Sequence, residues 1–213
     1  DASAGSSVGA SVGSIESEKG EPPSGQVGDK ARFWRYPDWR LLRATAWGSD
    51  RWGEVDVEAN VWTASLAQSI DQFKDVDYGA KDASEEGRDL VWGMRASGSS
   101  QASSAAGRFG LDVSGQGQWN RHDQRIDAYD ESGIRVPGQE LTYRQWQSSL
   151  GGELSWNLGP FGASLGGCVD GTGTISSGDK PRNPEVFATG LSATLEFAPT
   201  RAWRTWVSGG KRT

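Results

Sequence analysis

The sequence contains very little of the residue types that build metal centres and disulfides. Among its 213 residues there is one cysteine, one methionine and one histidine. The lone Cys168 excludes an internal disulfide framework, and the lone His122 leaves too few imidazole and thiolate ligands for a transition-metal site. We therefore expect no metal and no other cofactor.

Long hydrophobic runs and clustered cations are missing as well. No segment approaches the roughly 20 consecutive apolar residues of a membrane-spanning helix. Lysine and arginine form no run and the net charge is -6, whereas a nucleic-acid surface needs clustered cations. These absences exclude a helical membrane protein and predict no nucleic-acid partner.

Glycine and tryptophan, in contrast, are abundant, with 30 and 11 residues. Charged residues make up 23% and hydrophobic residues 35% of the chain, a balance that is too even for full disorder. The mean hydropathy of -0.62 is low. Membrane β-barrels keep such averages low because their strands are apolar on one face only and their loops are polar.

Two regions differ in their sequence pattern. Residues 1–29 are small, polar and rich in glycine and serine, and they follow neither the helical nor the strand period. We predict a flexible loop or tail there. From Phe33 onward every second residue is apolar or small, which is the period of a β-strand. Residues 30–213 are therefore predicted to belong to an outer-membrane β-barrel.

The alternation is clearest in residues 107–121. One face would carry Phe109, Leu111, Val113, Gly115, Gly117 and Trp119, and the other Arg108, Asp112, Ser114, Gln116, Gln118 and Asn120. The same split recurs in 52–66, 90–97, 148–158 and 184–198, with further strands near 39–48, 161–170 and 202–210. This pattern predicts about eight strands.

The predicted connections alternate in length. Short links fall at 48–51, 98–106, 157–160 and 199–201, and long polar links at 68–88, 121–140 and 171–183. Tight turns at one end and long loops at the other are typical of transmembrane barrels. The predicted fold class is therefore all-β, a segment of an antiparallel up-and-down transmembrane β-barrel with alternating short turns and long loops.

Strand length and tryptophan placement favour the same fold. Several segments exceed the 9–11 residues of a tilted spanning strand, while strands of soluble proteins centre on about 5–6. Tryptophans stand near predicted strand ends at Trp47, Trp52, Trp119, Trp156, Trp203 and Trp206. Such positions suit the two aromatic girdles of a membrane barrel. The alternative is that these side chains fill a soluble core or stack on sugars.

Three segments carry a resemblance to a known family. They are Arg32–Arg40 (RFWRYPDWR) leading into a strand, Gln68–Phe73 (QSIDQF) before a loop with Tyr78, and Ala202–Thr213. These spaced motifs, spread over residues 30–213, resemble the barrel region of TonB-dependent outer-membrane receptors. The resemblance implies a 22-stranded barrel with an N-terminal plug domain, of which this chain would be a middle slice.

The resemblance also implies a function and partners. Such receptors take up a scarce nutrient, such as a siderophore, cobalamin or an oligosaccharide, across the bacterial outer membrane. The expected partners are outer-membrane lipid, a small-molecule ligand at the extracellular loops, and the TonB complex, reached through a plug domain that is not present in this chain. The family has no enzyme site, and no binding residue is carried over from it.

Residue chemistry adds few site candidates. Asp56 and Glu58 share a face but fit a hydrophilic stripe that faces a lumen better than a glycosidase pair. His122 with Asp123 lacks a nucleophile elbow and fits a solvated loop histidine. We predict no catalytic residues. The long loops are the expected ligand surface, with Tyr78 and Tyr129 as candidate contacts for rings or aromatic ligands.

Two other functions stay open at the level of sequence. One is a different membrane barrel, either an autotransporter translocator or a small eight-stranded barrel. The other is a soluble carbohydrate-binding β-sandwich that stacks tryptophans on sugars. Membrane partitioning would separate the sandwich from both barrels.

Overall fold

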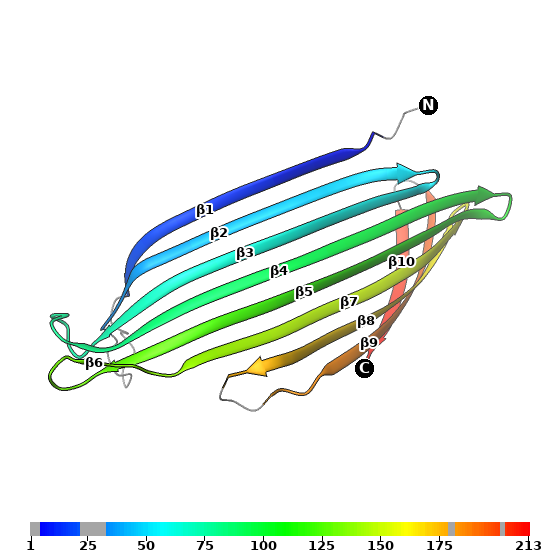
Figure 1. Ribbon diagram of the computed structural model, residues 1–213. Coiled ribbons are helices and arrows are strands. Elements are labelled where there is room, and N and C mark those ends of the chain that lie inside the picture. Colours follow the sequence, from blue (N-terminus) through cyan, green and yellow to red (C-terminus); the bar gives the residue numbers. More distant parts are fainter. Residues whose placement is uncertain (1–4, 22–32, 179–181, 201–202) are drawn as a thin grey trace.

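The computed structural model describes residues 5–21, 33–178, 182–200 and 203–213, which form strands, turns and loops (Figure 1). The strands are β1 (Ser7–Glu21), β2 (Phe33–Trp52), β3 (Val55–Phe73), β4 (Lys81–Ser104), β5 (Gly107–Tyr129), β6 (Arg135–Val136), β7 (Glu140–Leu158), β8 (Phe161–Ser177), β9 (Val186–Thr200) and β10 (Trp203–Arg212). No helix in these ranges has the length and apolar character needed to cross a bilayer.

All strands belong to one antiparallel sheet in the order β1-β2-β3-β4-β5-β7-β8-β9-β10, and the short β6 pairs with the end of β5. The predicted all-β, antiparallel, up-and-down arrangement is confirmed. The sheet is open over the described residues, with β1 and β10 at its edges. Closure into a barrel is therefore not part of this structure.

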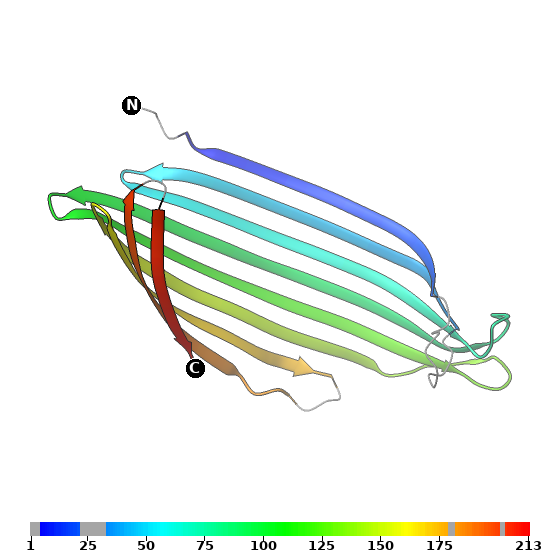
Figure 2. The same cartoon turned by 180° about the vertical axis from the view of Figure 1, so that it is seen from behind.

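The strands are long, up to 24 residues in β4 and 23 in β5. At about 3.3 Å per residue such strands run for about 75 Å. Figures 1 and 2 show them side by side, with the sheet curling so that β9 and β10 turn away from the plane of the others. Pro37, which donates no hydrogen bond, lies in β2 where the register with β3 shifts between Arg35 and Asp38.

The connections alternate as predicted. Two-residue turns at 53–54, 105–106 and 159–160 lie at one end of the sheet, and the longer links 74–80 and 130–139 lie at the other, while the connection after Gly178 includes residues outside the described ranges. Gly53 and Gly159 take positive φ values of 66° and 56°, which a tight turn requires. Of the predicted short links, 157–160 contains a turn, and 199–201 extends into residues outside the described ranges.

Several predicted boundaries are wrong. Residues 48–51 belong to β2, and the turn follows at Gly53; likewise β4 continues through most of 98–106. The long links are shorter than predicted because β3, β5 and β8 extend into them. The strand count is ten in the described residues, not eight.

The predicted flexible segment at residues 1–29 is also wrong where the structure describes it. Residues Ser7–Glu21 form β1, which pairs with β2 from Ser7 opposite Ser49 to Glu21 opposite Trp34. Small side chains hide the strand period, and the neighbouring strand supplies the hydrogen bonds. Residues 1–4 and 22–29 lie outside the described ranges.

The sheet has almost no core of its own. Ile70, 7% exposed, is the buried large hydrophobic residue of the described chain. The accessible surface is 14954 Å², whereas a compact soluble protein of 22.8 kDa exposes about 9,600 Å². A single layer of sheet therefore leaves its apolar side chains without a cover from the described residues.

Candidate membrane-facing surface and polar inner face

The strand register gathers the apolar side chains on one face of the sheet. Leu111 of β5 lies opposite Leu154 of β7, which lies opposite Leu165 of β8. The predicted apolar faces of residues 55–61, 90–96, 109–119, 150–158 and 187–197 all fall on this face. Their side chains are exposed, for example Leu150 at 61% and Leu191 at 68%.

An aromatic row borders this face near the short turns. It consists of Trp52, Phe109, Trp156, Phe161 and Phe197. The indole nitrogen of Trp156 donates to the carbonyl oxygen of Ala106 at 2.9 Å, and that of Trp52 donates to Asp50 at 3.0 Å. Both indole N–H groups thus have a polar partner, which suits a boundary between apolar and aqueous surroundings.

A second aromatic row crosses the same face further along the strands. Trp92, Trp119 and Trp146 lie directly opposite one another on β4, β5 and β7. The rings of Trp92 and Trp119 stack with centroids 4.1 Å apart, and Phe187 of β9 approaches Trp146 at 5.9 Å. Sequence analysis missed Trp92 and Trp146 as row members because they lie within strands; only the pairing brings them to the same level.

The two rows are separated by a constant distance. Ten residues lead from Phe109 to Trp119, and ten from Trp146 to Trp156. At about 3.3 Å per residue this is about 33 Å along a strand, which a barrel tilt of about 40° would reduce to about 25 Å. The apolar band of outer-membrane barrels is also about 25 Å tall.

The face between the rows, called the apolar band below, carries no charged side chain on β3 through β9. The exceptions lie on the flanking strands: Asp50 near the turn of β2, and Lys211 on the edge strand β10. Not all tryptophans predicted for girdles belong here, because Trp47 and Trp206 lie on the opposite face.

Beyond the second row the same face becomes charged. Arg121, Asp123, Arg125 and Asp127 follow Trp119 at alternate positions of β5. Asp127, only 1% exposed, accepts hydrogen bonds from the backbone N–H of Gly138 at 2.8 Å, from Arg125 at 3.0 Å and from the guanidinium of Arg135.

This network sets the charge state of Asp127. The Gly138 amide and then the two arginines hold the pKa of Asp127 at about 2, below its ordinary 3.8, and outweigh the opposing effect of desolvation. The carboxylate is therefore ionised at neutral pH and fastens the link 130–139 to β5.

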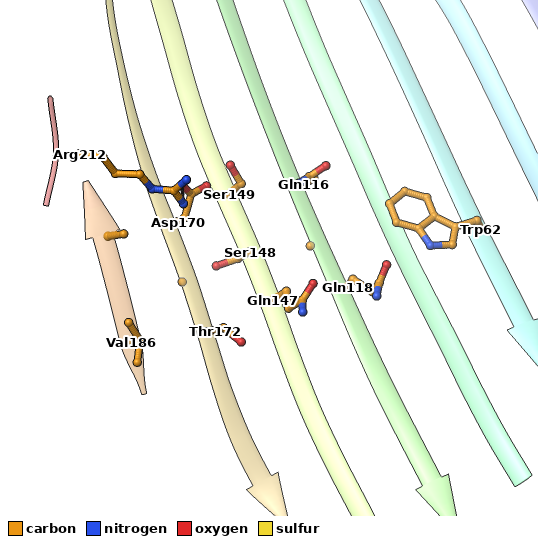
Figure 3. Close-up of a pocket in the computed structure, with 13 residues that line it drawn as sticks. Trp62, Gln116, Gln118, Gln147, Ser148, Ser149, Asp170, Thr172, Val186 and Arg212 are labelled. Carbon is orange, nitrogen blue, oxygen red and sulfur yellow. Dashed lines mark hydrogen bonds and ion pairs between the residues drawn. The ribbon is translucent and has the colours of Figure 1, made fainter. Parts of the chain in front are cut away.

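The opposite face of the sheet is polar and concave. A hollow of about 370 Å³ joins Trp62 of β3 to Arg212 of β10 across the strands between them. Side chains from strands that are far apart in the sheet line this hollow, from Trp62 at one side to Arg212 at the other (Figure 3). Amides and hydroxyls line it, namely Gln116, Gln118, Gln147, Ser149 and Thr172.

Polar contacts on the concave face are mostly internal. Gln118 donates to Asn120 at 3.0 Å, and Arg212 pairs with Asp170 at 2.8 Å across the intervening strand β9. Nearer the short turns, a second hollow is lined by Arg95 together with Asp56, Glu58, Asp112 and Glu153. The predicted assignment of Asp56 and Glu58 to a hydrophilic stripe agrees with their place on this face.

The two ligand-contact candidates lie on different elements of the structure. Tyr78 lies in the link 74–80, with a positive φ of 55°, and its ring packs edge-on against Phe73 and beneath the guanidinium of Arg35 at 4.2 Å. Tyr129 ends β5, where its backbone pairs with Arg135. Both lie at the long-loop end. Their role in ligand contact stays a prediction.

His122 is not a loop residue. It lies within β5 on the concave face, and its Nδ1 is 2.6 Å from the carboxylate of Asp89 on β4. The expectation that His122 lies in a loop is therefore wrong. Asp123, its neighbour in sequence, points to the other face and is bound by Thr142.

Comparison with known proteins does not assign the chain to a family. No protein-family model matches the chain, and no curated protein matches it significantly. The functional argument therefore rests on the geometry of the sheet and its two faces.

Proposed function

We propose that the chain forms part of the wall of a bacterial outer-membrane β-barrel that takes up a nutrient. The observation that carries this proposal is the apolar band, which two aromatic rows border at a constant spacing of ten residues. A bilayer would cover the exposed leucines, valines and phenylalanines of this face.

A soluble sandwich accounts for the same face less well. A sandwich buries its apolar faces against a second sheet about 10 Å away. The described strands form one layer, and every strand from β1 to β10 pairs within it. Leu154 at 59% and Leu195 at 67% exposure would then face water, which an isolated soluble sheet tolerates poorly.

The concave face supports a transport role. Its glutamines, serines and threonine present donors and acceptors that can replace water around a polar solute. In a closed barrel this face would line the interior, while the long links would stand at the extracellular end. The proposed route of uptake runs along this polar wall.

The finer proposal is a TonB-dependent receptor, which the resemblance of Arg32–Arg40 and Gln68–Phe73 supports. Ten strands are fewer than the 22 of such a barrel. In this proposal β1 and β10 pair with further strands of the same wall, because long unpaired edges invite aggregation. Uptake would then depend on a plug domain and on the TonB complex.

Cysteine accessibility tests the membrane placement. In a Cys168→Ser background, Leu150→Cys and Ser149→Cys place a thiol on adjacent residues of β7 that face opposite sides of the sheet. With the protein folded into lipid vesicles, a water-soluble maleimide is expected to label the cysteine at 149 and to spare that at 150. Equal labelling at both positions would refute the proposal.

Growth tests the uptake role and its energy source. A strain that lacks the gene is expected to grow poorly when iron, cobalamin or an oligosaccharide is limiting, and loss of TonB should reproduce the defect. Unchanged growth of the deletion strain on all three limiting nutrients would contradict the receptor proposal but not the barrel itself.

A further inference from the structure

Arginines gather on the apolar face immediately beyond the second aromatic row. Arg121 of β5 lies two residues past Trp119, and Arg144 of β7 lies two residues before Trp146. One step along the face is two residues, about 7 Å of strand. Both side chains therefore start at the level where a bilayer changes from acyl chains to headgroups.

The register places these two cations side by side. Arg121 lies directly opposite Arg144, and Arg88 of β4 follows one step further along, opposite Asp123. Like charges opposite each other destabilise a sheet pair. Arg88, Arg121 and Arg144 are called the arginine belt below.

The belt has more positive charge than its surroundings neutralise. Asp123 pairs with Arg121 at 2.8 Å and also accepts from Thr142. Within the described residues, Arg88 and Arg144 form no ion pair or hydrogen bond, although Asp123 also attracts Arg144 electrostatically, so three arginines share one carboxylate. Arg40 lies at the level of Arg88 but pairs with Asp38, so it adds no free cation.

The charge reverses at the next level away from the band. Asp38, Glu86 and Glu140 lie there opposite or beside Arg125, and Arg135 approaches Glu86 at 3.8 Å, so acidic side chains outnumber the cations among the described residues at this level. The basic charge is thus confined to the border of the apolar band. A general basic surface for soluble anions would have no reason to follow that border.

From these positions we infer that the arginine belt binds the phosphate groups of lipid headgroups. Guanidinium groups recognise phosphate through paired N–H donors, and a phosphate between Arg121 and Arg144 would remove their repulsion. Long arginine side chains at this level also reach the headgroups readily. This inference rests on the proposed membrane placement.

Lipid retention tests the inference on the whole protein, folded in detergent and analysed by native mass spectrometry. The probes are phosphatidic acid and diacylglycerol with the same acyl chains, which differ only in the phosphate. The wild-type protein should retain phosphatidic acid preferentially. Replacing Arg121 and Arg144 by Gln should reduce that preference by about thirtyfold, since each cation near a headgroup contributes about fivefold.

The matched control replaces Arg95 of β4 and Arg108 of β5 by Gln, two arginines that lie on the concave face. This variant should keep the wild-type preference. A preference that survives the loss of Arg121 and Arg144, or that falls equally in the control, overturns the inference. If the double variant does not fold, Arg88→Gln alone is expected to lower the preference about fivefold, and an unchanged preference again overturns it.

Two further outcomes distinguish the alternatives. Inorganic phosphate that displaces phosphatidic acid at equal concentration would assign the belt to a soluble anion and overturn the lipid assignment. The labelling of cysteines at 149 and 150 reports membrane placement independently. If the cysteine at 150 is protected from the maleimide but phosphatidic acid is not preferred over diacylglycerol, this inference alone is overturned. If the cysteines at 149 and 150 are labelled equally, both the proposed function and this inference are overturned.

Discussion

The same strands behave differently on the two sides of the second aromatic row. On β5 the residues from Phe109 to Trp119 present exposed apolar side chains on one face, whereas Arg121 to Asp127 present charged side chains on that same face. The pairing of β4, β5 and β7 continues across the border without interruption.

The difference lies in what surrounds each half of the strand. Asp127 in the charged half is 1% exposed and satisfied by Arg125, Arg135 and Gly138. Leu111 in the apolar half is 46% exposed and has no comparable cover. The charged half thus supplies tertiary contacts of its own, while the apolar side chains of the other half receive none from the described residues.

The largest effect is expected from a charge in the middle of the apolar band. Leu150→Arg should lower the free energy of unfolding from a bilayer by about 2–4 kcal/mol, because the guanidinium would sit near the membrane midplane. Urea titration of the protein in vesicles, followed by tryptophan fluorescence, measures this. Ser149→Arg is the control, and an equal loss there would erase the distinction between the two faces.

A smaller effect is expected at the border. Trp119→Leu removes the stack with Trp92, whose centroid is 4.1 Å away, but keeps an apolar side chain in place. The free energy of unfolding should fall by about 0.5–1.5 kcal/mol. The same titration applies, and Trp206→Leu on the concave face of β10 should change it by less. A larger loss at Trp206 would argue against the row as a structural border.

A still smaller effect is expected just beyond the border. Arg121 and Asp123 form a partly exposed pair at 2.8 Å, and such pairs contribute about 0.2–1 kcal/mol. Arg121→Gln should therefore change global stability little, and any change should shrink at high salt. A loss as large as that of Leu150→Arg would show that the charged half also depends on the bilayer.

The smallest change in the global free energy of unfolding is expected when the interactions of Asp127 are lost, because the effect should be confined to residues 130–139. The folded pKa of Asp127 is lowered to about 2, so its stabilising contribution is complete above its unfolded value of 3.8 and is lost as pH falls through about 2. Hydrogen exchange of residues 130–139 should accelerate over this range.

Asp127→Asn should give the same fast exchange at every pH, with an unchanged exchange rate in the apolar half of β5. Glu131→Gln is the control, since Glu131 is exposed and, in the described part of the chain, forms no ion pair or hydrogen bond with Arg125 or Arg135. Protection of 130–139 that is independent of pH in the wild-type protein would contradict the proposed fastening role of Asp127.

Much of the local structure could be predicted from the sequence. The faces of β3, β5, β7 and β9 follow from strict alternation, as at Phe109 through Trp119, and the turn at Gly159-Pro160 follows from turn chemistry. Strand ends were harder to predict. Polar residues of the charged half, such as His122 and Asp123, look like a loop although they continue β5.

The features that sequence analysis missed depend on how the strands pair. β1 is a strand because β2 supplies its hydrogen bonds, although its glycines and serines show no period. Trp146 joins the second row because the register sets it opposite Trp119. The arginine belt arises in the same way, since Arg121 and Arg144 are 23 positions apart in the sequence.

The sequence by itself determined which face of each strand is apolar, because side chains alternate with a period of two whatever the neighbours are. It also determined that the chain is all-β with turns and loops of alternating length. Only the tertiary structure decided the levels of the two aromatic rows and the pairing of Arg121 with Arg144. Register describes how neighbouring strands align, so it cannot be read from the sequence of one strand alone.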